Sequence, residues 1–180
     1  MVRDMKKILQ LVAISFLLSS ASSFAEFKQN KDWFWDLSLD PGNFVYAATM
    51  NDSERLLGQY CYFDKGTCVY MVTLGITCTE GSEYPSIINS SVGVVTVDLI
   101  CAHKYEDENT FFITPFDDVD NIIKQASTIG FAVAMEGDEF KVVRFSLAGS
   151  TYAIEKMRSG AEVLSDQINY KSNTKSEEYL

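Results

Sequence analysis

The sequence predicts a mainly β domain, an antiparallel β-sandwich or barrel-like fold that carries two short helices and is braced by disulfides. Three observations favour this class. Short segments of alternating apolar and polar residues are separated by turn-forming residues along most of the chain. One such turn, Asp64-Lys65-Gly66, stands between two β-rich runs and indicates a hairpin. All four cysteines, finally, lie within residues 56–103.

The chain begins with a segment typical of a secretory signal peptide. Basic side chains precede an almost wholly apolar run, residues 8–18, and Ser23 and Ala25 supply small residues for cleavage. The apolar run is too short to span a bilayer, so we expect no stable membrane anchor after cleavage and a periplasmic or secreted protein. The expected division is a signal peptide at 1–25, a single β-rich domain at 26–165 and a polar, disordered tail at 166–180.

The charge of the chain argues against several partners. The formal net charge is −10, which repels the phosphates of nucleic acids and the surface of anionic membranes. The sequence has no glycine-rich phosphate loop and no dinucleotide-binding fingerprint, so we expect no cofactor.

The first strands are expected around an aromatic cluster. The run Trp33-Phe34-Trp35 is more typical of a strand packed on the core than of a ligand platform, although both interpretations are open. The turn-forming run 40–43 follows, and then a strand over residues 44–50. Residues 26–32 are polar and are expected to be mobile.

The spacing of the cysteines predicts how they pair. If Tyr62 and Thr67 close the first hairpin, Cys61 falls opposite Cys68. Cys78 then lies on the same buried side of the same run as Cys68, residues 67–78. Cys101 lies on the buried side of a further strand, and it forms the second bridge with Cys78. Four cysteines in an exported chain imply disulfides, and a zinc site would need closer pairs of the C-x2-C type. The disulfide residues are therefore Cys61, Cys68, Cys78 and Cys101.

After the first hairpin, the sequence predicts a loop, two strands, a short helix, a second hairpin and a terminal helix. Residues 79–85 are expected to be an irregular polar loop, with residues 87–88 covering part of the core and a turn at 89–91. Strands over 91–103 and 110–114 and a helix over Val119–Gln125 follow. Strands over 129–135 and 141–147 form the second hairpin, and a helix over 150–158 ends the domain.

The register of the second hairpin is predicted from its apolar residues. Placing Met135 opposite Lys141 sets three apolar pairs on one face. These pairs are Val133 with Val143, Phe131 with Phe145, and Ile129 with Leu147.

No arrangement of residues points to catalysis. His103 is the only histidine, so any Ser-His-Asp or Cys-His arrangement must use it. The sequence has no G-x-S-x-G before a helix, and the cysteines are expected in disulfides. We expect His103 to be structural and the chain not to be an enzyme, with no catalytic residue.

Two acidic groups could bind calcium. They are residues 106–108, in an expected loop, and Asp117, Asp118 and Asp120, at the start of the expected helix. Both lack the glycine-containing loop of calcium sites, so a solvated loop and a helix cap are favoured and no metal site is expected.

The order of these parts resembles the invasion-associated locus B family of bacterial periplasmic proteins. The resemblance rests on the signal peptide, the β-rich body with its cysteines, and the run Phe145–Ile154, in which a strand, a glycine and a helix follow one another. It implies a β-sandwich without a catalytic motif and a role in host-cell entry or envelope function, with no functional residue to transfer.

The expected function is therefore that of an exported, non-catalytic binding domain with a protein partner and an unknown oligomeric state. Two alternatives stay open. One is an envelope hydrolase that uses His103, and the other is a secreted enzyme inhibitor that presents the loop Thr79–Asn89.

Overall fold

One ten-stranded antiparallel sheet forms the body of the protein, in the order β1-β2-β3-β4-β5-β8-β7-β6-β9-β10. The computed structural model describes residues 28–39, 43–105, 108–135, 137 and 139–177, so the expected signal peptide lies outside the described residues. The strands are β1 (Lys28–Asn30), β2 (Trp33–Asp36), β3 (Phe44–Met50), β4 (Leu56–Tyr62), β5 (Thr67–Thr73), β6 (Glu83–Ser90), β7 (Gly93–Tyr105), β8 (Glu108–Thr114), β9 (Thr128–Ala134) and β10 (Phe140–Ser146).

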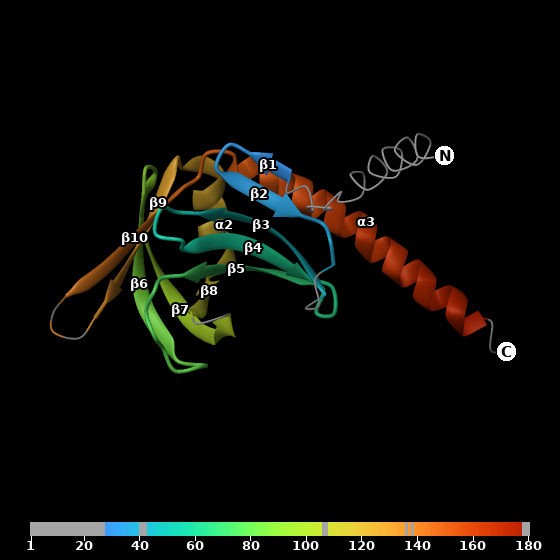
Figure 1. Ribbon diagram of the computed structural model, residues 1–180, viewed down its shortest axis with the longest axis horizontal. Helices are drawn as coiled ribbons and strands as arrows, with labels where there is room; N and C mark the ends of the chain where they lie inside the picture. Colours follow the sequence, from blue (N-terminus) through green and yellow to red (C-terminus); the bar gives the residue numbers. More distant parts are fainter. Residues whose placement is uncertain (1–27, 40–42, 106–107, 136, 138, 178–180) are drawn as a thin grey trace, which may run out of the picture.

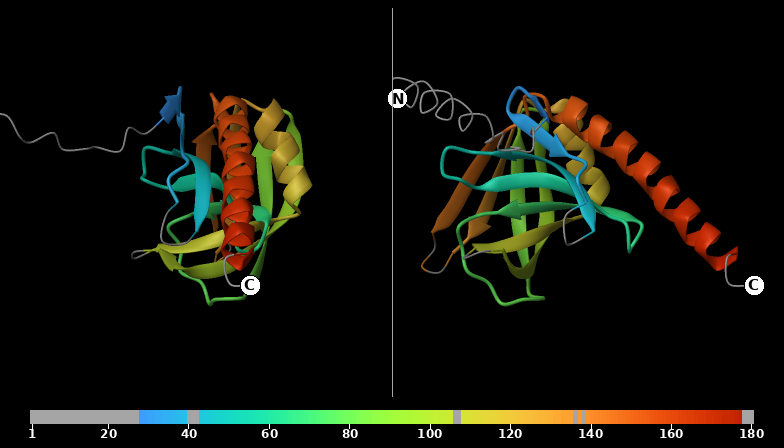
Figure 2. Two further views of the ribbon diagram at one scale, coloured as in Figure 1. Left: turned by 90° about the vertical axis from the view of Figure 1, so that its right-hand side faces the viewer. Right: turned by 45° about the vertical axis from the view of Figure 1, so that its right-hand side comes forward.

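The sheet curls without closing. Figure 2 shows β3, β4 and β5 running across the direction of β6, β7, β9 and β10. Hydrogen bonds bring the two ends of the sheet together at one end of β10, where Asn51 Nδ2 and Trp33 Nε1 donate to the carbonyls of Arg144 and Ser146, both at 3.0 Å. The mainly β, antiparallel class is thus confirmed, as one continuous, barrel-like sheet.

Two helices cover the concave side of this sheet in the described residues. They are α2 (Phe116–Gln125) and α3 (Ser150–Glu177), of which α3 runs along β2 and β3 and then continues past the sheet (Figure 1). Trp35 meets Tyr152 edge-on, with ring centroids 5.7 Å apart, and Leu37 packs directly on Gly160. The core lies between sheet and helices. Its largest fully buried side chains include Trp33, Tyr70, Phe111, Phe131, Ile154 and Met157.

The first hairpin has the predicted register. Tyr62 pairs with Thr67 and Cys61 with Cys68, and the pairing continues to Leu57. Gly66 lies in the turn at φ 59°, a conformation that glycine adopts at little cost. The alternation of buried and exposed side chains therefore predicted this pairing correctly.

The second hairpin corrects the predicted register by two residues. Phe131 pairs with Val143 and Ile129 with Phe145, because the Met135 N–H donates to the Glu139 carbonyl at 2.8 Å and closes a shorter turn around Gly137. A shift of two keeps every side chain on its predicted face, which is why the apolar pattern alone could not exclude it.

The expected polar loop before the Ser91–His103 run is also corrected. Residues 83–90 form β6, an interior strand that pairs with β7 on one side and β9 on the other. Pro85 is tolerated because the pairing with β9 begins one residue later, at Ser86, so no hydrogen bond to β9 needs a Pro85 N–H. The loop Thr79–Asn89, on which the inhibitor alternative depended, is therefore mostly a strand.

Three further boundaries differ from expectation. Residues 28–30 form β1 instead of a mobile segment, and α2 begins at Phe116, ahead of the expected Val119. The last helix does not end near Arg158 but continues to Glu177, into the stretch expected to be a disordered tail. The sequence after Arg158 contains no proline that would stop it.

Candidate functional site

The four cysteines form the two predicted disulfides. Cys61 is bonded to Cys68 across the first hairpin, and Cys78 is bonded to Cys101 on β7. The Cα atoms lie 4.0 Å and 6.0 Å apart, respectively. Both bridges brace the sheet, and neither leaves a free thiol among the described residues.

His103 lies exposed near the end of β7. A register shift between Cys101 and Lys104 breaks the alternation there, so Cys101 is buried while His103 faces solvent. The His103 carbonyl accepts a hydrogen bond from Thr110 Oγ1 at 2.9 Å, but its imidazole has no hydrogen-bond or ion-pair partner among the described residues.

The acidic group on α2 is split between solvent and the protein interior. Asp117 and Asp118 are exposed in the first turn and make no side-chain cap, whereas Asp120 is buried. Of the other candidate group, only Glu108 is described, and it forms an ion pair with Arg55. Within the described residues, no three histidine, cysteine, aspartate or glutamate side chains gather into a metal-binding group.

Asp120 belongs to a buried polar cluster that sequence reasoning missed. Its carboxylate accepts a hydrogen bond from Tyr70 Oη at 2.7 Å and forms ion pairs with Arg158 and Lys124 at 2.5 and 2.6 Å. Arg158 Nε also donates to Gln59 Oε1 at 2.7 Å, while Gln59 Nε2 has no hydrogen-bond partner among the described residues. The cluster connects β4, β5, α2 and α3, so it fixes both helices to the sheet.

The pKa values in this cluster follow from these contacts. Burial of the Asp120 carboxyl opposes its ionisation, but hydrogen bonds from Lys124, Tyr70 and Arg158 outweigh burial and lower its pKa. Burial, and then the hydrogen bond to Asp120, raise the pKa of the Tyr70 hydroxyl. The cluster therefore holds a carboxylate and a neutral phenol, packed away from solvent.

The convex side of β2, β3 and β4 carries a cluster of aromatic side chains. Phe34, Phe44, Tyr46, Tyr60 and Tyr62 are each half-buried, and we call them the aromatic face. Tyr46 and Tyr60 stack at 5.7 Å between centroids, and Phe44 lies 5.4 to 6.2 Å from each of the three tyrosines. Phe34 meets Tyr46 edge-on. The rings form one continuous apolar surface on a rigid three-stranded support.

Charged residues lie beside the aromatic face. The Lys65 ammonium lies 5.5 Å from the centre of the Tyr62 ring, within the range of a cation–π contact. Asp64 follows Tyr62 by two residues, and burial together with the Asp64 charge raises the pKa of Tyr62. On the β2 side of the face, Asp36 pairs with Tyr46 across β2 and β3. The face thus combines π surfaces with nearby carboxylates.

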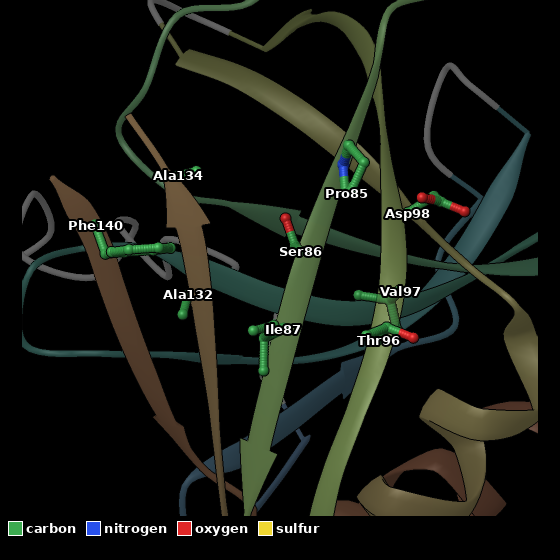
Figure 3. A pocket seen from close by; sticks show the side chains of 9 residues that line it. All are labelled: Pro85, Ser86, Ile87, Thr96, Val97, Asp98, Ala132, Ala134 and Phe140. Carbon is green, nitrogen blue, oxygen red and sulfur yellow. The ribbon is translucent and has the colours of Figure 1, made fainter. Parts of the chain in front are cut away.

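A shallow groove of about 300 Å³ marks a second surface, on the convex side of β6, β7, β9 and β10. Figure 3 shows Ala132 on the floor of this groove, between Ile87 of β6 and Phe140 of β10. Two large apolar side chains here are strongly exposed, Phe140 at 65% and Val94 at 63%. We call this surface the groove face. It is defined by Asp98, Val94, Ile87, Ala132, Phe140 and Arg144.

A solved structure shares this fold. The crystal structure of invasion associated protein B from Bartonella henselae superimposes with a TM-score of 0.56 at 12% sequence identity, over 76% of this chain and 98% of that one. No protein-family model and no curated protein matches the chain. At this identity the likeness concerns the fold, and it agrees with the fold resemblance noted in the sequence.

The two surfaces could be traced only in part from the sequence. The cluster Trp33-Phe34-Trp35 was predicted to pack on the core, and both tryptophans do so, while Phe34 points to the convex side. The pairing of β3 with β4, which aligns Tyr46 with Tyr60, was not predicted from the sequence.

Among the described residues, no helix has both the length and the apolar composition needed to cross a membrane.

Proposed function

We propose that this protein is an exported, non-catalytic binding domain that holds basic side chains of a protein partner on its aromatic face. The observation that carries the proposal is the continuous set of five rings on β2–β4 with the Lys65 ammonium already placed over Tyr62. Tyrosine and phenylalanine are enriched at protein interfaces, and their ring faces attract lysine and arginine. On the aromatic face, Lys65 over Tyr62 is an example of this contact within the chain.

The charge of the whole molecule supports a basic partner. A net charge of −10 draws cationic surfaces toward the protein, and Asp36, paired with Tyr46, and Asp64, whose charge acts on Tyr62, place carboxylates beside the aromatic face. The rings and carboxylates therefore favour the same partner chemistry, a segment that carries lysine or arginine.

Export is the second part of the proposal. The signal-like N-terminus and two disulfides favour an oxidising compartment outside the cytoplasm. The structural neighbour is named as an invasion-associated protein, which supports placing the role in envelope function or host-cell entry. N-terminal sequencing of exported protein is expected to begin at Glu26 or within a few residues of it.

Site-specific photo-crosslinking tests the binding part. A benzoylphenylalanine at Tyr62 should capture a partner in the native compartment, through a partner peptide that contains lysine or arginine. The matched control is Tyr152, an exposed tyrosine on α3 that also has a lysine ammonium over its ring, at 5.4 Å. Equal capture from both positions, or capture from Tyr152 alone, would contradict the proposed site.

The hydrolase alternative keeps its own test. Substitution His103→Ala should leave the fold unchanged, because the imidazole is exposed. A hydrolytic activity of the purified protein that disappears in this variant would replace the binding proposal.

A further inference from the structure

The groove face exposes several large apolar side chains to solvent. Phe140, Val94, Val142 and Ile87 are all exposed and all point to the convex side of the same four strands. An apolar patch that is framed by polar residues is a candidate interaction site. This surface is separate from the aromatic face, which lies on β2–β4.

The strand pairing arranges the groove face as a grid. Asp98 and Val94 lie on β7 at one side, and Phe140 and Arg144 lie on β10 at the other. The pairing sets Asp98 in the row of Phe140 and Val94 in the row of Arg144. Two rows are paired across all four strands, Thr96-Ile87-Ala132-Val142 and Val94-Asn89-Gly130-Arg144. The third row joins the pairs Asp98-Pro85 and Ala134-Phe140, where the register of β6 and β9 is extended by one residue.

Two opposite charges occupy diagonal corners of this grid. Asp98 and Arg144 are both exposed, and neither forms an ion pair with a described residue. Arg144 lies over Gly130, with its Cγ 3.3 Å from where a Cβ of residue 130 would be. The other two corners, Val94 and Phe140, are apolar.

We propose that two copies of this protein pack groove face to groove face across a twofold axis that runs along the Val94–Phe140 diagonal. Such an axis exchanges the other two corners, so Asp98 of each copy meets Arg144 of the other. Phe140 meets its own counterpart, and Ile87 and Ala132 come together at the centre. The apolar middle is buried, and both unpaired charges acquire partners.

The dimensions of the grid fit this arrangement. Four strands at about 4.8 Å spacing span about 14 Å, and three alternate residues along a strand span about 13 Å. Because the grid is nearly square, its diagonal lies at about 45° to the strands, and the strands of the two copies cross at about 90°, as in orthogonal sheet packing.

A second copy is favoured over another partner by charge. A twofold interface must be complementary to itself, and one acidic and one basic corner on opposite sides of the apolar Val94–Phe140 diagonal satisfy this requirement. A face four strands wide is smaller than the roughly 800 Å² that each partner buries in a standard interface. We therefore expect a weak dimer that forms at high protein concentration.

Charge reversal tests the pairing directly. Sedimentation equilibrium of the full mature chain, from about 10 μM to 1 mM, should show a dimer whose dissociation constant rises about tenfold or more in Asp98→Arg and in Arg144→Asp, as each places like charges together. The combined Asp98→Arg/Arg144→Asp variant should restore the wild-type constant to within about threefold, because the pair is exchanged and remains complementary. Glu162→Arg, an exposed residue on α3, changes the net charge by the same amount as Asp98→Arg and is the control.

A cysteine at the axis gives a second readout. Phe140→Cys should form an intermolecular disulfide under mild oxidation, whereas Val163→Cys, exposed on α3, should not. A protein that stays monomeric throughout, or a double variant that is no better than the single ones, would overturn the proposal. Thermal melts of each variant separate loss of the dimer from loss of the fold.

Discussion

Asp120 shows that the role of a residue depends on which face of its helix it occupies. Asp117 and Asp118 face solvent, whereas Asp120 points inward to Tyr70 and Arg158. The acidic run in the sequence suggested a cap for α2, and nothing in it distinguished the third carboxylate. The partners come from β5 and α3, which are distant in sequence, so only the tertiary structure identifies the cluster.

Removing this carboxylate should destabilise the protein. We expect Asp120→Asn to lower the free energy of unfolding by about 2–3 kcal/mol, because it leaves Arg158 and Lys124 without their counter-charge. Urea unfolding measures the change. Asp118→Asn, an exposed carboxylate on the same helix, should change the free energy by less than about 0.5 kcal/mol. Equal effects of the two variants would contradict the role given to Asp120.

The same residue should govern part of the acid response. The pKa of Asp120 is lower in the folded protein than in the unfolded chain, so its ionisation stabilises the fold above a pH of about 4, and this contribution is lost as pH falls through the folded pKa. The difference in unfolding free energy between wild type and Asp120→Asn should therefore shrink between pH 6 and pH 2.5. A difference in unfolding free energy that stays constant over that pH range would show that the charge of Asp120 does not cause it.

At the scale of elements, the sequence predicted local pairing better than long-range pairing. The first hairpin was correct in register because two cysteines and a glycine turn constrain it. The second has no such constraint, and its predicted register was wrong by two residues without moving any side chain to the other face. Strand β6 was missed because Pro85 and its polar neighbours resemble a loop, while its two partners, β7 and β9, are set by the global topology.

The two disulfides should differ in their contributions. Cys78–Cys101 closes a longer loop than Cys61–Cys68, with a sequence separation of 23 against 7. On the chain-entropy model its removal by paired Cys→Ser substitutions should cost about 1 kcal/mol more. Urea unfolding of the two double variants measures the difference. A larger cost for the hairpin bridge would mean that native-state contacts, and not loop length, decide the contribution.

At the scale of the whole molecule, the curl of the sheet separates three surfaces. The concave side is filled by α2 and α3, while the aromatic face and the groove face occupy different strands of the convex side (Figure 2). The sequence indicated a β domain with apolar strand faces, but it could not indicate which outward residues meet across neighbouring strands. Both surfaces depend on strand order, and the order of a ten-stranded sheet is set by contacts far apart in the chain.

Binding of a basic segment to the aromatic face is the central claim, and an NMR titration tests it most directly. A short peptide rich in lysine and arginine should shift the amide signals of β2–β4, and the shifts should be largely lost in Tyr60→Leu/Tyr62→Leu. This variant keeps apolar bulk but removes two ring faces. Tyr152→Leu should retain them. Shifts spread over the acidic surface and unchanged in Tyr60→Leu/Tyr62→Leu would contradict the claim, because net charge alone would then explain the binding.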